Sequence, residues 1–292
     1  MAPRVHLVRH AQGYHNLNVA NHAMHDPLLT PFGEEQCRTL SKDFPYNDKI
    51  DLVVASPLKR TIYTALYSFP GPIQQRQLKV IALPELQETS DLPCDTGSDV
   101  AEVQREFQGK PVNLAKLQGP EGATWNSKKG KWAPNSDAIQ GRAQEARQWL
   151  LNRPEKDIVV VTHGGFLHYF TEDWTGHDKF QGSHHHEHHH LHLHQHSEKF
   201  HPHHHMGEID LFLNELRNDH RAGTGWANTE FRSYTFAPDG GAHLIETPES
   251  RQRRAGTEKP LSKEEQKNLA RTTSDKSNDG SYQKIQSIQS KV

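Results

Sequence analysis

An adjacent arginine and histidine, Arg9 and His10, directly follow the short apolar run Val5–Val8. A run of this kind predicts a buried strand, and in an open α/β sheet the residues beyond the carboxyl end of a strand face the crevice where ligands bind. An imidazole in that position can act as a nucleophile, and the planar guanidinium beside it can hold a phosphate through paired hydrogen bonds. The pair therefore predicts phosphoryl chemistry at the end of the first strand.

Two further strand ends carry polar or basic residues. Ser56 ends the apolar run 50–56 and is followed one helical turn later by Arg60, and His163 directly follows the apolar run 157–162. Each group alone is also compatible with a surface pair, an ordinary helix start or a plain turn. In a parallel sheet, however, these ends meet at one edge, and two guanidiniums and two imidazoles in one pocket repel each other unless a multiply charged anion lies between them. Charge-assisted hydrogen bonds would hold such an anion, so the predicted ligand is a phosphate group.

The elements that must position these side chains alternate between strand and helix. Thr30 as N-cap, Pro31 at the first helical position and Glu34 in the first turn predict a helix that starts at Pro31. The predicted strands are 5–8, 50–56, 79–83, 157–162 and a final, edge strand within 226–236, and the predicted helices are 31–44, 61–69, 98–107, 136–151, 166–174 and 209–216. This alternation predicts an α/β fold, a three-layer α/β/α sandwich around a mostly parallel central sheet.

Composition divides the chain into one domain and a tail. The 292 residues are 33% hydrophobic, which is below the usual globular share, and much of the shortfall lies in a histidine-rich block and in the polar C-terminal stretch. We expect residues 1–246 to form a single domain that carries a disordered histidine-rich insertion at about 182–206. We expect residues 247–292 to form a disordered polar tail. Neither the histidine-rich insertion nor this tail can bury enough apolar surface to order itself.

Charge and cysteine content limit which binding partners and which cellular compartment the sequence favours. The formal net charge of −2 gives no field of the size that nucleic-acid binding needs, and the sequence has no apolar run of about 18 residues that would span a membrane. Cys37 and Cys94 do not suggest a disulfide framework, and the first strand starts too early to leave room for a signal peptide. We expect a cytoplasmic protein, with the nucleus as the alternative, that binds neither nucleic acid nor membrane.

Three motifs occur in a fixed order: Arg9-His10 with Asn16, then Ser56-Pro57-x-x-Arg60, then Thr162-His163-Gly164. Leu28, Thr30, Gly33 and Gln36 follow the first motif. This set resembles the histidine phosphatase superfamily, also called the phosphoglycerate mutase-like family, over about residues 5–174 and 226–236. The segments 86–91, 94–97 and 226–236 look like a fungal, phosphomutase-like branch. The resemblance implies a phosphoglycerate mutase-like form of the α/β/α fold.

The resemblance also implies a phosphohistidine mechanism. His10 would attack phosphorus and hold the phosphoryl group covalently. Arg9, Asn16, Arg60 and His163 would bind the phosphoryl oxygens and stabilise the charge of the transition state, which makes His163 a catalytic residue as well. His10 needs a free lone pair for this attack, so its other ring nitrogen must donate to an acceptor, which the sequence does not identify.

The leaving oxygen needs a proton from a nearby acid, and the two candidates are Glu88 and Glu85. Leu86-x-Glu88 matches the family's leucine-x-glutamate position, so the resemblance favours Glu88, which would also activate water in the second step. Ala11 departs from the family pattern, which usually has glycine there. Alanine at positive φ costs about 1 kcal/mol or more, so Ala11 suits an active site if its dihedral angles are ordinary.

The leading hypothesis is a cofactor-independent histidine phosphatase, a phosphoric monoester hydrolase, that acts on a small phosphorylated metabolite and has no metal in its site. The first alternative is a phosphoglycerate mutase-type phosphomutase, which needs further basic residues and a lid; Lys128, Lys129 and Lys131 are basic residues in the segment before the fourth predicted helix.

The second alternative is an inactive fold that acts as a binding or metal-sequestering module, against which the intact set of pocket residues argues. The histidine-rich insertion, which includes His184–His190, lacks the defined spacing of a structural metal site, so any metal binding there is expected to be loose. The substrate and the oligomeric state stay open.

Overall fold

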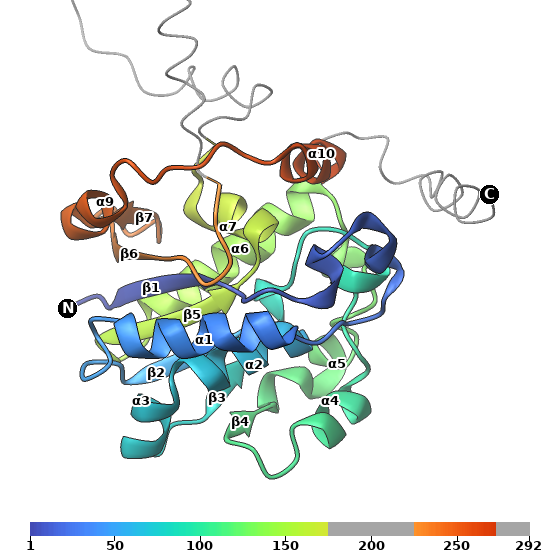
Figure 1. Cartoon of the computed structure of the whole chain (residues 1–292), viewed down its shortest axis with the longest axis horizontal. Coiled ribbons are helices and arrows are strands. Elements are labelled where there is room, and N and C mark those ends of the chain that lie inside the picture. Colours follow the sequence, from blue (N-terminus) through green and yellow to red (C-terminus); the bar gives the residue numbers. More distant parts are fainter. Residues whose placement is uncertain (175–224, 273–292) are drawn as a thin grey trace, which may run out of the picture.

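One seven-stranded sheet forms the centre of the computed structural model, which describes residues 1–174 and 225–272 (Figure 1). The strand order is β4-β3-β2-β5-β1-β6-β7. The strands span Arg4–Arg9 (β1), Leu52–Ala55 (β2), Val80–Ala82 (β3), Val112–Asn113 (β4), Asp157–Thr162 (β5), Phe231–Phe236 (β6) and Leu244–Glu246 (β7). Strands β1 to β5 run parallel to one another, whereas β6 is antiparallel to β1 and β7 is antiparallel to β6. The mostly parallel sheet that the sequence predicts is confirmed.

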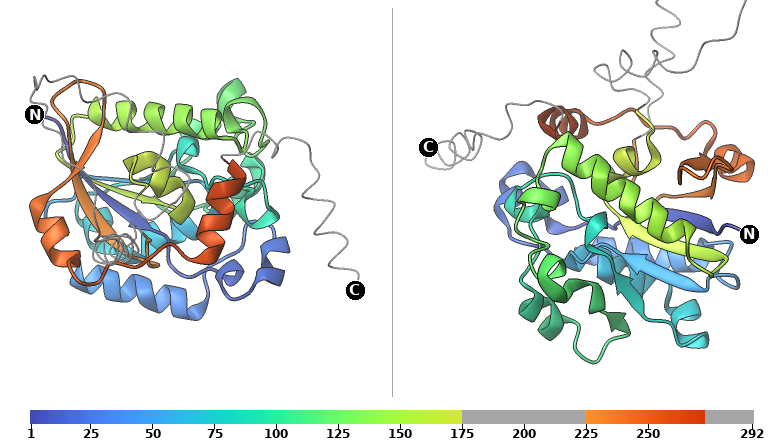
Figure 2. Two further views of the ribbon diagram at one scale, coloured as in Figure 1. Left: turned by 90° about the horizontal axis from the view of Figure 1, so that it is seen from above. Right: turned by 180° about the vertical axis from the view of Figure 1, so that it is seen from behind.

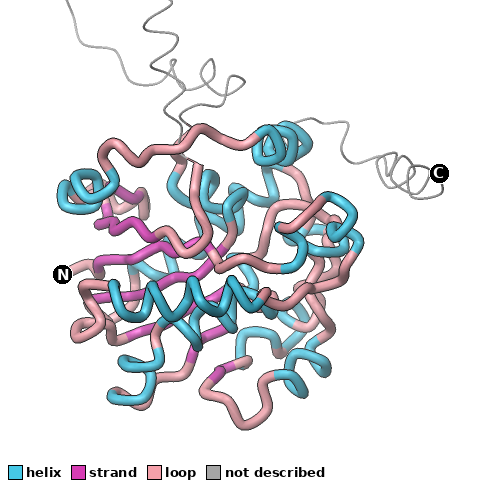
Figure 3. The backbone as a smooth tube through the Cα atoms, viewed as in Figure 1, coloured by secondary structure: helices cyan, strands magenta, loops and turns pink. Residues whose placement is uncertain are grey.

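Helices cover both faces of this sheet (Figure 2). Alternate side chains of each strand point to opposite faces, so Val5 and Leu7 pack against α6 (Ser136–Leu151) and α7 (Gly164–Thr171) while Val8 packs against α1 (Pro31–Asp43) and α2 (Lys59–Ser68). Figure 3 shows the strands enclosed between these two helical layers. The main helices are α1 (Pro31–Asp43), α2 (Lys59–Ser68), α3 (Pro70–Gln75), α4 (Val100–Glu106), α5 (Gly119–Gly122), α6 (Ser136–Leu151) and α7 (Gly164–Thr171), followed by α9 (Pro248–Arg254) and α10 (Lys263–Thr272). The three-layer architecture is the predicted one.

The predicted starts of α1 and α6 are confirmed, whereas α2, α4 and α7 start two residues away from their predicted starts at 61, 98 and 166. Thr30 caps α1, because its Oγ1 accepts a hydrogen bond from the Gly33 amide at 3.0 Å, and Pro31 occupies the first helical position. Asn135 caps α6 in the same way, through a bond of 2.9 Å from the Ala138 amide. Both β5 and α6 have the bounds that the sequence predicts.

Two expectations about the C-terminal part differ from the structure. Strand β6 is not the edge strand, because β7 pairs with it on its outer side. The stretch from residue 247 is not a disordered tail throughout: it forms α9 and α10, and Leu261 and Leu269 are buried in the cluster under α7. A polar segment with only a few apolar side chains can be ordered when those few reach an existing core, which composition alone does not reveal.

The remaining predictions for the chain lie outside the described residues. These are the histidine-rich insertion at 182–206, the helix at 209–216 and the end of the tail from 273 to 292. Across residues 1–174 and 225–272, none of the helices has the length and apolar character needed to cross a membrane.

Candidate active site

The sheet register brings the three predicted strand ends together. Arg9 at the end of β1 pairs with Thr162 at the end of β5, and Ala55 of β2 pairs with Val161 of β5. Beyond these pairs, the His10 amide donates to the Thr162 carbonyl at 2.9 Å and the Ser56 amide donates to the Val161 carbonyl at 3.0 Å. His10, His163 and Ser56 therefore leave three neighbouring strands at the same edge, as the sequence predicts for a parallel sheet.

His10 is buried as a neutral imidazole with a defined proton position. Its Nδ1 lies 2.7 Å from the Ala11 carbonyl oxygen, and a carbonyl can only accept, so Nδ1 carries the proton and Nε2 keeps a lone pair. Burial, followed by the charges of Arg60 and Arg9, holds the pKa of His10 well below its usual value. The acceptor that the sequence could not identify is thus the next residue's own carbonyl. Ala11 is not among the described residues with positive φ, so alanine carries no strain there.

Arg60 links most of the pocket residues. It lies in the first turn of α2 and is fully buried. Its Nε donates to His10 Nε2 at 3.3 Å, and its Nη2 donates to His163 Nδ1 at 3.2 Å. Since His163 accepts at Nδ1, its proton lies on Nε2, which donates to Ser56 Oγ at 2.9 Å. Burial and the charge of Arg60 also lower the pKa of His163 well below its usual value, so both imidazoles are neutral beside the guanidinium.

Asp95 balances the charge of Arg60 and was assigned no role from the sequence. Its Oδ1 accepts from Arg60 Nη2 at 2.9 Å, and its Oδ2 accepts from Ser90 Oγ at 2.5 Å. The Cys94 carbonyl accepts from Arg60 Nη1 at 2.6 Å. The segment between β3 and α4 therefore holds the guanidinium in place.

The Glu88 side chain lies against the N-terminus of α7, the helix that begins directly after His163. Its carboxylate accepts from the amides of Thr89 (2.8 Å), Phe166 (2.9 Å) and Gly165 (3.2 Å). Burial raises the pKa of Glu88, and the negative charge of Asp95 raises it further, although these amide bonds act in the opposite direction. A carboxyl group with a raised pKa can hold a proton for a leaving group.

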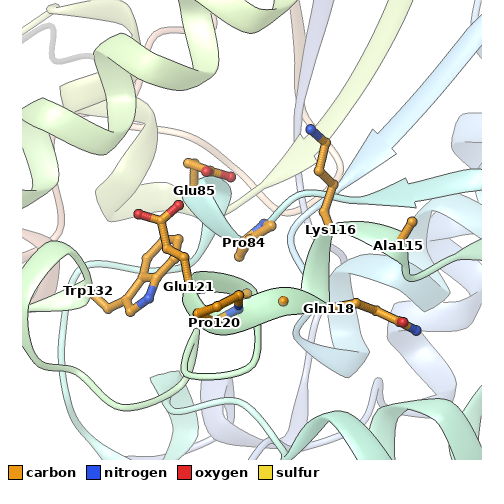
Figure 4. A pocket seen from close by; sticks show the side chains of 10 residues that line it. Pro84, Glu85, Ala115, Lys116, Gln118, Pro120, Glu121 and Trp132 are labelled. Atoms are coloured by element: carbon orange, nitrogen blue, oxygen red, sulfur yellow. The ribbon is translucent and has the colours of Figure 1, made fainter.

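Glu85, the other candidate acid, has different surroundings. Its Oε1 lies 3.1 Å from Lys131 Nζ, and its side chain lines a separate pocket with Lys116, Glu121 and Trp132 (Figure 4). None of His10, Arg60 and His163 lines that pocket. The geometry therefore favours Glu88 over Glu85.

The two remaining predicted phosphate ligands differ in their positions. Arg9 is tied by a hydrogen bond from Nη1 to the Trp226 carbonyl, while its buried Nε has no partner among the described residues. Asn16 is exposed and uses its Oδ1 to accept from the Gly13 amide at 3.0 Å. A role for Asn16 in phosphate binding stays a prediction.

Two further residues lie near the site: His15, to which the sequence assigns no role, and Lys128, which the sequence offers only as one of three basic residues that a mutase would use. The ring of His15 is buried 5.4 Å from that of His10, and its Nδ1 has no partner within the described part of the chain. Lys128 donates from Nζ to the Glu88 carbonyl at 3.3 Å. His15 lies in a short 3-10 helix, Tyr14–Asn16, and Lys128 lies in a loop; in neither place does periodicity or a strand end mark a residue as part of a site.

Comparison with known proteins shows which proteins this chain is similar to. The model of the histidine phosphatase superfamily (branch 1) matches residues 5–206, which is more than half of the chain. A probable phosphatase of Schizosaccharomyces pombe is 27% identical over 168 residues, which cover 57% of this chain and 76% of that protein. Phosphoglycerate mutase-like protein 1 of Arabidopsis thaliana is 29% identical over 198 residues, which cover 56% of this chain and 68% of that protein. The solved structure of the Bombix mori ecdysone phosphate phosphatase with tungstate has a TM-score of 0.49 and 13% identity, over 84% of this chain and 92% of the other.

Proposed function

This chain belongs to the histidine phosphatase superfamily, and we propose that it hydrolyses small phosphomonoesters through a phosphohistidine intermediate on His10. The observation that carries this proposal is the state of the His10 ring. Nδ1 donates to the Ala11 carbonyl at 2.7 Å, and Nε2 presents its lone pair toward the buried guanidinium of Arg60 at 3.3 Å. A neutral imidazole with one free nitrogen beside a cation is suited to attack an anionic phosphoryl group.

In the first step, His10 Nε2 attacks phosphorus and an N–P bond forms as the P–O bond to the alcohol breaks. Arg9, Arg60 and His163 bind the phosphoryl oxygens and stabilise the charge that spreads over them. Asn16 is a further candidate for this binding. Glu88 gives its proton to the leaving oxygen, which is the reason that a raised pKa matters.

In the second step, water attacks the phosphorus of the phosphohistidine. Glu88, now ionised, takes a proton from this water, and the N–P bond breaks as inorganic phosphate forms. His10 regains its lone pair and Glu88 its proton, so the cycle closes without a cofactor or a metal.

The lysines of the segment before α6 favour hydrolysis over a mutase reaction. A mutase must retain a doubly phosphorylated intermediate, which calls for additional cations over the pocket. Lys131 is engaged by carboxylates at 2.6 Å (Glu145), 3.1 Å (Glu85) and 3.2 Å (Glu121), and Lys129 is exposed. Only Lys128 of these three lies beside Glu88. The name of the Schizosaccharomyces pombe relative, a probable phosphatase, supports the same choice.

The proposal extends to the substrate and the cellular compartment. A small phosphorylated metabolite is the partner that the pocket residues suit, and the cytoplasm is the proposed compartment. An inactive binding module is the weaker proposal, because Arg60 lies within hydrogen-bonding distance of His10 and His163 and its charge acts on Glu88.

The test is a search for products and for the covalent intermediate. Purified protein is incubated with a panel of ³²P-labelled phosphomonoesters, and the products are separated into free phosphate, isomerised ester and labelled protein. We expect free phosphate and an acid-labile label on the wild-type protein, no label on His10→Ala, and a normal label on His25→Asn, a change at an exposed histidine. Isomer without phosphate would overturn hydrolysis, and a label that survives His10→Ala would exclude His10 as the nucleophile.

A further inference from the structure

The backbone that carries Glu88 is held by side chains rather than by a strand or an α-helix. Residues 85–88 begin in the short 3-10 helix Pro84–Leu86 and continue as irregular chain. Their four successive carbonyl groups each accept a hydrogen bond from a side chain. Arg142 donates to the carbonyls of Glu85 (2.6 Å), Gln87 (2.6 Å) and Glu88 (3.0 Å), and Thr162 Oγ1 donates to the Leu86 carbonyl at 2.7 Å. One arginine therefore supplies three of these four bonds.

Arg142 stands in the apolar face of α6. It is 1% exposed and lies one turn after Ile139 and one turn before Ala146, which both belong to the hydrophobic core. Burying a guanidinium costs free energy unless its donors are satisfied, and burial lowers the pKa of Arg142, whereas the charge of Glu88 raises it. The hydrogen bonds and the charge that offset this cost thus come from the segment that carries the proposed acid.

The same guanidinium also contacts the first turn of α7. Its Cζ lies 4.6 Å from the centroid of the Phe166 ring, and the Phe166 amide donates to Glu88 Oε1 at 2.9 Å. A planar guanidinium can stack on an aromatic ring while its edges donate to carbonyls. Arg142 therefore contacts both the backbone of Glu88 and the helix whose amides bind the Glu88 carboxylate.

A second buried arginine of α6 makes comparable bonds at the other end of α7. Arg147 is 3% exposed, and its Nη1 donates to the carbonyls of Tyr169 at 3.3 Å and Phe170 at 3.2 Å. A cation is favourable at this C-terminal end of the helix. These bonds join α6 to α7 without involving residues 85–88, so Arg147 is a matched control for the structural part of the role of Arg142.

We propose that Arg142 is a positioning residue for the general acid: it fixes the backbone of Glu88 so that the carboxyl group reaches the leaving oxygen. This inference rests on the proposed function, in which Glu88 gives its proton to that oxygen. Arg142 acts through Glu88 and touches neither the phosphoryl group nor the alcohol. A displacement of about 1 Å in a catalytic group can cost roughly a hundredfold in rate, so loss of three backbone bonds is expected to be felt at the acid.

The test compares two esters that need the acid to different degrees. These are the alkyl phosphate that wild type hydrolyses fastest and p-nitrophenyl phosphate, whose leaving group needs less protonation. kcat, KM and the urea midpoint of unfolding are measured for wild type, Arg142→Met, Arg142→Lys and Arg147→Met. Arg142→Met should lower kcat/KM for the alkyl phosphate about 100-fold, mainly through kcat, and for p-nitrophenyl phosphate less than about tenfold. Arg142→Lys, whose ammonium reaches fewer of the three carbonyls, should fall between wild type and Arg142→Met.

The pH profile gives a readout that a purely structural role would not change. Since the charge of Glu88 raises the pKa of Arg142, the guanidinium in turn favours the ionised form of Glu88. Its removal in Arg142→Met should raise the pKa of Glu88 and move the basic limb of kcat/KM to higher pH. The basic limb should stay in place in Arg147→Met.

The control separates positioning of the acid from loss of stability. Arg147→Met should lower the urea midpoint as Arg142→Met does, but any loss of activity should be equal for the two esters. Equal losses for the two esters in Arg142→Met, or a loss confined to the alkyl phosphate in Arg147→Met as well, would overturn the inference while wild type remains a phosphatase. If Arg142→Met does not fold, the same comparison is made with Arg142→Lys, which keeps the charge. Absence of phosphate release from both esters by wild type would overturn the proposed function and this inference with it.

Discussion

Arg60 donates a hydrogen bond from Nε to Nε2 of His10 at 3.3 Å, so the proposed nucleophile and a proposed phosphate ligand are already in contact. The same guanidinium reaches His163 at 3.2 Å and Asp95 at 2.9 Å. In the proposed mechanism an incoming phosphoryl group inserts at this junction, where its oxygens take over donors that now point at imidazole nitrogens. Arg60 is therefore the residue whose replacement tests the proposed mechanism most directly.

Arg60→Lys should reduce kcat/KM about 100-fold or more, comparable to the loss of a donor that stabilises transition-state charge. Lysine keeps the positive charge that Asp95 needs, so the fold should be retained, but an ammonium cannot reproduce the planar set of bonds to His10, His163 and the Cys94 carbonyl. Steady-state kinetics with any hydrolysed ester measures the loss. Arg76→Lys is the control, because Arg76 is an exposed arginine that bonds the Asp48 carbonyl. Equal activity of the two variants would remove Arg60 from phosphate binding.

Asp95→Asn should shift the pH dependence of kcat/KM. The carboxylate of Asp95 raises the pKa of Glu88, so its removal lowers that pKa, and Glu88 then loses its proton at a lower pH. The basic limb, where the general acid becomes ionised, should therefore move to lower pH. Loss of the ion pair to Arg60 should also reduce the maximum about tenfold or more. Asp99→Asn, at an exposed position, should leave the profile in place, and an unchanged basic limb in Asp95→Asn would argue against Glu88 as the titrating acid.

The outcome at these residues shows which parts of the site a sequence can reveal. His10, Arg60 and His163 follow strands or begin a helix, so their meeting is a consequence of a parallel sheet that hydrophobic patterning predicts. Asp95 ends a short 3-10 helix, Pro93–Asp95, in a segment between β3 and α4 whose position depends on bonds between residues far apart in the sequence. Asp26 provides examples of such bonds: its carboxylate accepts from the Lys59 amide of α2 at 3.0 Å and from the hydroxyl of Ser98, three residues after Asp95, at 2.7 Å.

Bonds of that kind have no periodic signature, and the same applies to His15 and Lys128. The order of α10 was missed for a related reason: its composition is polar, and only its contact with α7 accounts for the burial of Leu269. Helix caps such as Thr30 and Asn135 were within reach of sequence reasoning because each involves residues only three positions apart.

Gly165→Ala should impair general acid catalysis without unfolding the protein. A Cβ at residue 165 would lie 2.7 Å from Glu88 Oε1 and 3.1 Å from Thr89 Oγ1, so the carboxylate would have to move from the N-terminus of α7. We expect kcat/KM for an alkyl phosphate to fall about 100-fold, in line with loss of an acid–base group. The loss should be smaller for p-nitrophenyl phosphate, whose leaving group needs less protonation.

Gly141→Ala provides the control for the preceding change. Gly141 lies within α6 and a Cβ there would meet nothing within 4 Å, so this variant should keep full activity and gain about 0.5–1 kcal/mol of stability. Equal losses for the two esters in Gly165→Ala would indicate a general distortion rather than displacement of the acid.

Leu269→Ala should lower the free energy of unfolding by about 2–4 kcal/mol, which is the usual range for a leucine removed from a core. Leu269 is fully buried in the cluster beneath α7, and α10 is tied to α7 by a bond of 2.7 Å between Tyr169 Oη and Thr272 Oγ1. The comparison is Leu17→Ala, which removes a leucine that is 52% exposed and should cost less than about 1 kcal/mol. Urea unfolding followed by tryptophan fluorescence measures both, and the slope of the transition should be the same in the two variants because the extent of folded structure is unchanged. Glu265 of α10 lies close to the site, since a Cβ on residue 164 would lie 3.3 Å from Arg9 Nε and 3.4 Å from Glu265 Oε1. If Leu269→Ala were no more costly than Leu17→Ala, α10 would not belong to the folded domain and Glu265 would have no part in the site.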